Sequence, residues 1–157
     1  MPKRISGLLT MSDAASLALH TTVLLAAEPH RSLQAREIAA TFRFSKPHVA
    51  KVLQQLRRAG IISSARGPRG GFWLAEGANE ITLLQVFEAM EGPLRARNCL
   101  LGRRPLCGGE TCILAGLVGN LNRQVKAYLA ETTLSKLAPV YKSFNRRYRD
   151  AQEHRQD

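Results

Sequence analysis

The chain has 157 residues, 45% of them hydrophobic, a length typical of one domain with at most one appendage and a composition sufficient for a buried core. Its 23 lysines and arginines against 12 acidic residues give a net charge of +11, which indicates a polyanionic partner. The sequence contains no run of about 18 apolar residues, so a membrane-spanning helix is excluded.

The positive charge is concentrated toward the amino terminus. Residues 1–75 carry 11 basic and 3 acidic side chains, whereas residues 76–157 carry 12 and 9. This asymmetry favours nucleic acid over a membrane surface as the partner. The apolar stretch LALHTTVLLAA at residues 17–27 includes a histidine and lacks a typical cleavage site, so we expect a helix of a cytoplasmic protein there, not a signal peptide.

Three helices are predicted within residues 12–59. Each follows a serine whose hydroxyl can accept a hydrogen bond from the first helical turn. These expected N-caps are Ser12, Ser32 and Ser45. Pro29 ends the first helix and Gly60 ends the third. Because only a tight turn separates the second and third helices, the pattern is that of a helix-turn-helix.

Residues 60–76, GIISSARGPRGGFWLAE, contain two β-prone runs joined by glycine, proline and arginine. We expect a hairpin whose tip carries Arg66 and Arg69. A hairpin directly after a helix-turn-helix forms a winged helix, which suits duplex DNA because its helix fits the major groove and its wing can reach phosphates or the minor groove. The alternative is an ordinary hairpin with solvated arginines; the basic helix that begins SKPH at Ser45 favours the wing.

A long helix is predicted over residues 113–132, after a helix at 82–92. Its apolar side chains form a narrow stripe of Leu114, Leu117, Leu121, Val125 and Tyr128. Such a stripe requires a partner. A second copy of the chain would give a two-fold dimer that matches two DNA half-sites, whereas packing on the same chain is the alternative.

The predicted fold class is therefore mainly α with a small β-hairpin wing. We expect a winged helix-turn-helix domain over residues 8–92 and a cysteine loop over residues 93–112. A dimerisation helix and C-terminal segment would follow over residues 113–148, with a disordered tail over residues 149–157.

All three cysteines, Cys99, Cys107 and Cys112, fall within one short loop. They lack the close C-x2-C pairs of structural zinc sites. Longer, glycine-containing spacings suit an iron–sulfur cluster, of either the [2Fe–2S] or the [4Fe–4S] type. The competing interpretation is a regulator without a cluster, whose cysteines sense oxidants directly by thiol chemistry.

Three thiolates leave a fourth ligand to come from elsewhere. His20, in the middle of the first helix, is the first candidate, and Asp13 is the second; another or a small-molecule ligand is the third possibility. A histidine in that position can also be a simple hydrogen-bonded or surface residue. The chain has no C-x-x-C motif, phosphate-cradling glycine loop or acid/base constellation, so we do not expect an enzyme.

Several segments together resemble the Rrf-type winged-helix bacterial transcription regulators, the IscR- and NsrR-like iron–sulfur sensors. They are SKPHVAKVLQQLRRAGIISSARGPRGGFWLA, ITLLQVFEAMEGP, the three-cysteine loop and TLSKLAPVYK. The resemblance implies a homodimeric repressor of palindromic promoter sites. It also implies a cluster, held by the three cysteines, that reports nitric oxide, redox state or the supply of iron and clusters.

The resemblance further implies which residues contact DNA. It places Ser45, His48, Lys51, Arg66 and Arg69 at DNA-contacting positions. Lys46, which carries a charge at the start of the basic helix, is the sixth expected contact. For the fourth ligand, one branch uses a histidine at the position of Ala115, and another uses an aspartate at the position of Ser16. His20 matches the histidine that a redox-sensing branch takes from its first helix.

Overall fold

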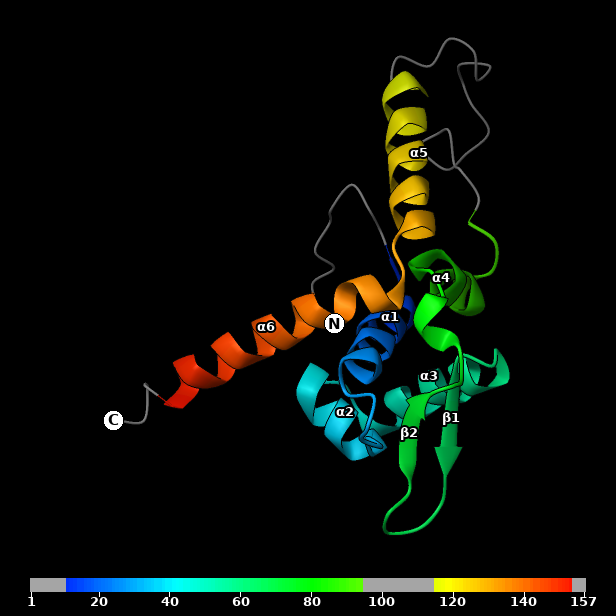
Figure 1. Ribbon diagram of the computed structural model, residues 1–157. Coiled ribbons are helices and arrows are strands. Elements are labelled where there is room, and N and C mark those ends of the chain that lie inside the picture. Colours follow the sequence, from blue (N-terminus) through cyan, green and yellow to red (C-terminus); the bar gives the residue numbers. More distant parts are fainter. Residues whose placement is uncertain (1–10, 95–114, 154–157) are drawn as a thin grey trace.

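The computed structural model describes residues 11–94 and 115–153. Its elements, in chain order, are α1 (Asp13–Ala27), α2 (Ala35–Phe42), α3 (Lys46–Arg58), β1 (Ile62–Ala65), β2 (Gly71–Leu74), the short 3-10 helix η1 (Ala78–Glu80), α4 (Leu83–Glu91), α5 (Ala115–Glu131) and α6 (Leu134–Glu153). The predicted fold class is confirmed: helices dominate, and the strands form one antiparallel pair. Helices α2 and α3 and the hairpin gather at one end, and α5 and α6 extend away from it (Figure 1).

Helix α1 lies at the centre of the fold. Its N-cap is Ser12, as predicted, and the Ser12 hydroxyl oxygen accepts a hydrogen bond from the Ala15 N–H at 3.1 Å. The helix buries side chains around most of its circumference, which is the pattern of an enclosed helix. It packs against α3, α4 and α6.

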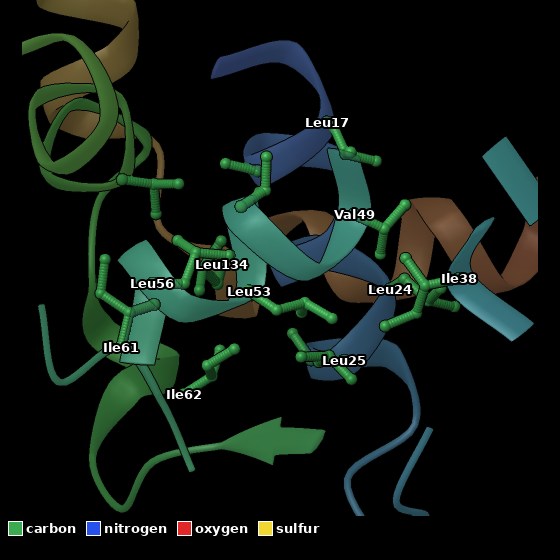
Figure 2. Close-up of a cluster of buried hydrophobic side chains, with 14 of the residues drawn as sticks. Leu17, Leu24, Leu25, Ile38, Val49, Leu53, Leu56, Ile61, Ile62 and Leu134 are labelled. Atoms are coloured by element: carbon green, nitrogen blue, oxygen red, sulfur yellow. The ribbon is translucent and has the colours of Figure 1, made fainter. Parts of the chain in front are cut away.

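One hydrophobic core joins the winged domain to the C-terminal helices (Figure 2). Leu17 and Leu25 of α1 and Leu53 of α3 are each only 1% exposed. Leu134, the first residue of α6, is fully buried in the same cluster. The start of α6 is therefore part of the core of the winged domain.

Helix α2 begins later than the sequence predicts. Its N-cap is Gln34, so the expected cap at Ser32 is wrong. The reason is Leu33, whose N–H donates to the Phe72 carbonyl at 3.0 Å and whose carbonyl accepts the Phe72 N–H at 2.8 Å. The chain can turn into a helix only after this bridge, and the Glu37 carboxylate then accepts the Gln34 N–H at 2.7 Å.

The link between α5 and α6 is pinned to the start of α4. The Leu83 N–H donates to the Thr132 carbonyl at 2.9 Å, and the Leu134 N–H donates to the Ile81 carbonyl at 3.0 Å. Beyond this point α6 continues to Glu153 and so includes residues 149–153 of the segment for which the sequence predicts disorder. No glycine or proline interrupts residues 140–153 to end the helix earlier.

Candidate functional site

The helix-turn-helix presents a strongly basic surface. Every lysine and arginine between residues 31 and 69 is exposed: Arg31, Arg36, Arg43, Lys46, Lys51, Arg57, Arg58, Arg66 and Arg69. The single acidic residue of this segment, Glu37, forms an ion pair with Arg31. The remaining charges are not neutralised by ion pairs within the described residues, so the helix-turn-helix and the wing together can attract a polyanion.

The hairpin forms where it is predicted. Strands β1 and β2 pair with Ile62 opposite Leu74 and Ala65 opposite Gly71, and the exposed Arg66 and Arg69 lie in the turn between them. Figure 1 shows this tip extending from the end of the molecule formed by α2 and α3.

Two contacts fix the wing to the helix-turn-helix. The first is the backbone bridge between Leu33 and Phe72. The second is the Gln34 amide nitrogen, which lies 3.5 Å from the carbonyl oxygen of Pro68 in the wing tip. Because Gln34 is also the N-cap of α2, the wing and the helix-turn-helix are held as one unit.

The predicted contacts on α3 differ in their accessibility. Ser45, Lys46 and Lys51 are exposed, and Ser45 occupies the expected N-cap position. The His48 ring instead stacks on Phe44, with centroids 5.3 Å apart and planes 16° apart. Its Nε2 is buried and has no hydrogen-bond partner among the described residues. In this arrangement His48 supports the turn before α3.

Both candidates for the fourth metal ligand lie on α1 and are exposed. Asp13 is the first residue of the helix. His20 Nδ1 lies 2.7 Å from the Ser16 carbonyl oxygen, which can only accept, so Nδ1 carries the hydrogen; in the neutral ring this leaves the lone pair on Nε2. The His20 ring also contacts the edge of Phe42, the last residue of α2, at a centroid distance of 5.8 Å.

Cys99, Cys107 and Cys112 lie outside the described residues, but the segment that leads to them is described up to Leu94. The Leu94 N–H donates to the Glu88 carboxylate at 3.0 Å. The Ser12 hydroxyl donates a hydrogen bond to the Glu91 carboxylate. The end of α4, after which the chain leads to the cysteines, therefore lies next to the amino terminus of α1, the helix that carries both candidate ligands.

The described residues alone do not make a metal centre. Within residues 11–94 and 115–153, no three His, Cys, Asp or Glu side chains come together as a potential metal site. A metal centre would therefore need at least one ligand from outside these ranges, where the three cysteines lie.

The apolar stripe of α5 is only partly covered. Leu117 and Tyr128 are 51% and 59% exposed, whereas Leu121 and Val125 are half-buried. Val118 and Leu129, next to the stripe, are buried in the same chain. Leu114 lies outside the described residues. Helix α5 therefore packs in part on its own chain and leaves Leu117 and Tyr128 in solvent, while the expected dimer stays a prediction. Among the described helices, none has the length and apolarity to cross a bilayer.

Comparison with known proteins agrees with this architecture. Residues 11–139 match the Rrf2 family, described as iron-dependent transcriptional regulators. A protein of Aquifex aeolicus with the provisional name HTH-type transcriptional regulator is 29% identical over 131 residues, which are 82% of this chain and 91% of that protein. The regulator IscR of Photorhabdus laumondii is 31% identical over 93 residues, covering 59% of this chain and 56% of IscR.

Solved structures share the fold. CymR, the global cysteine regulator of B. subtilis, superposes with a TM-score of 0.69 at 26% identity, covering 85% of this chain and 98% of CymR. IscR of T. potens has a TM-score of 0.64 at 19% identity, covering 86% and 90%. The family and these relatives are transcriptional regulators, which confirms the predicted DNA-binding, non-enzymatic function. The chain belongs to the Rrf2 family of transcriptional regulators.

Proposed function

We propose that this regulator binds DNA with an affinity set by an iron–sulfur cluster, held by Cys99, Cys107, Cys112 and His20. The observation that most supports the proposal is the hydrogen bond that orients the His20 ring. Its Nδ1–H is bound by the Ser16 carbonyl, and its Nε2 lone pair stays available on an exposed side chain. Metal-binding histidines are commonly oriented in this way, by donating the second ring N–H to a backbone carbonyl.

The donor set fits such a group. Thiolates and imidazole are the ligands that iron–sulfur clusters take in proteins. When bound, the cluster would supply reactivity toward oxygen and nitric oxide. The arginines at positions 97, 103 and 104 lie close to the cysteines in sequence, and their charges favour the thiolate form that a ligand requires.

The described contacts offer a route from the cluster ligands to the DNA-binding surface. His20 contacts Phe42, which is the last residue of α2 and lies four residues before the start of α3. A displacement of the His20 ring would therefore act on the end of α2 and on the turn that orients α3. A coupling free energy of about 1–3 kcal/mol changes affinity by about 5–150-fold, which is enough for a switch.

We further propose that two copies associate through the uncovered side of α5 and repress transcription from a palindromic promoter site in the cytoplasm. The exposed Leu117 and Tyr128 support this arrangement. The proposed DNA contacts are Ser45, Lys46, His48, Lys51, Arg66 and Arg69. Of these, His48 has its Nε2 buried while its ring stacks on Phe44, so this nitrogen could bind DNA only after the ring turns.

Anaerobic purification tests the proposal. The native or reconstituted protein should be coloured and contain iron and acid-labile sulfide, with a ratio and spectrum that identify the cluster type. Cys99→Ala, Cys107→Ala and Cys112→Ala should each remove the colour, and His20→Ala should alter the spectrum while Asp13→Ala leaves it unchanged. Protein that remains colourless after reconstitution with iron and sulfide contradicts the cluster.

Direct oxidant sensing by the cysteines is the second candidate. It is favoured by the solved oxidized form of Staphylococcus aureus CymR, which shares this fold with a TM-score of 0.64. In that case the protein would contain no iron, and peroxide would consume free thiols and change DNA affinity together. Parallel iron and thiol analysis separates the two candidates.

A further inference from the structure

We infer that Arg43, in the turn between α2 and α3, contacts a DNA phosphate. The reason lies in its backbone. Arg43 has φ 57° and ψ 39°, and it is the one non-glycine residue with a positive φ in the described part of the chain. Side chains with a Cβ rarely adopt this left-handed conformation, because the Cβ approaches the following carbonyl oxygen.

The left-handed residue is needed to end α2. The Phe44 N–H turns back to donate to the Ala39 carbonyl at 3.1 Å, as in a Schellman-type helix end. Glycine is the usual residue at this place, and the same chain uses it where α3 ends: Gly60 has φ 72°, and the Ile61 N–H donates to the Leu56 carbonyl at 3.0 Å. The fold itself would accept glycine at position 43.

No contact within the described protein explains why arginine stands there instead. Its side chain is exposed and forms no ion pair or hydrogen bond with any other described residue. Strained residues that persist without a structural reason are often functional. Arg43 lies two residues before Ser45, the N-cap of α3, and three residues before the exposed Lys46. Its position at the edge of this basic surface suits a backbone phosphate better than a base edge.

The inference rests on the helix-turn-helix surface proposed above and is independent of the cluster. Arg43→Gly removes the charge and relieves the backbone, so its effects on stability and binding should have opposite signs. The melting temperature should rise, while affinity for DNA falls. On both a 30-base-pair duplex selected by the wild-type protein from a random library and a mixed-sequence duplex, the slope of log K against log salt should fall by about 0.9, the value for one phosphate contact.

Two controls sharpen the result. Arg43→Lys keeps the charge and should retain the slope, and Arg123→Gln, an exposed arginine on α5, changes the net charge equally and should leave binding unchanged. Arg43→Gly with wild-type affinity and slope overturns the inference. If Lys51→Ala still lowers the slope in that case, only Arg43 was misplaced; if it does not, the whole proposed surface is wrong.

Discussion

Lys51 and Arg69 carry charges that no ion pair within the described residues neutralises, one on α3 and one in the wing. We predict that Lys51→Ala and Arg69→Ala each weaken DNA binding and reduce the salt dependence of log K by about 0.9 per contact. Fluorescence anisotropy over a range of salt concentrations measures both quantities, with Arg123→Gln as the control. Slopes unchanged in both variants would place the interface elsewhere.

The sequence correctly predicts the N-cap positions Ser12 and Ser45, because cap residues are recognised from the residues next to them along the chain. Of these two, only the Ser12 hydroxyl accepts a hydrogen bond from its own helix; the Ser45 side chain makes no such bond. The N-cap of α2 is Gln34 and not the predicted Ser32, and the sequence could not show this difference. The bridge between Leu33 and Phe72 joins segments far apart in sequence and leaves no periodic pattern. The stack of Phe44 on His48 was likewise missed, although the four-residue spacing of two rings was a usable signal.

At the level of secondary structure, the turn of the wing depends on Gly70, one of the glycines from which the sequence predicts the hairpin. A Cβ on Gly70 would lie 2.7 Å from the carbonyl carbon of Arg66 and would collide with the Ala65 carbonyl oxygen. We predict that Gly70→Ala opens the turn, lowers stability by about 1–3 kcal/mol as overpacking does, and weakens DNA binding because Arg66 and Arg69 are displaced.

Gly116→Ala is the matched control, since nothing lies within 4 Å of its added methyl group. Thermal unfolding and DNA titration of both variants make the comparison. Wild-type DNA affinity in Gly70→Ala would show that the wing does not contribute to binding.

The uncovered stripe of α5 is the second element with a testable role. Leu117→Glu combined with Tyr128→Glu places two charges on the exposed apolar side and should convert a dimer to a monomer in sedimentation experiments. Ala130→Glu, exposed on another side of the same helix, should leave the dimer intact. A wild-type protein that sediments as a monomer at micromolar concentration would contradict the proposed association.

For the complete fold, the sequence predicts the winged helix correctly because its hydrophobic periodicity, caps and turn residues all indicate the same structure. The sequence also shows that the three cysteines lie close together along the chain, but the fourth ligand stays a prediction. Spacing along the chain could not show that the end of α4 lies beside the start of α1, since the bond between Ser12 and Glu91 joins residues from opposite ends of the winged domain. Nor could it show that His20 contacts Phe42.

These long-range contacts link α1 both to the end of α4, after which the chain leads to the cysteines, and to the end of α2. We propose that the state of the cluster changes how the basic surface binds DNA. The direct measurement is the affinity of iron-loaded and iron-free protein for the same selected 30-base-pair duplex, anaerobically and at one salt concentration. We predict a difference of about 5–150-fold, lost in His20→Ala. Equal affinities of the two wild-type forms would show that the cluster does not control DNA binding.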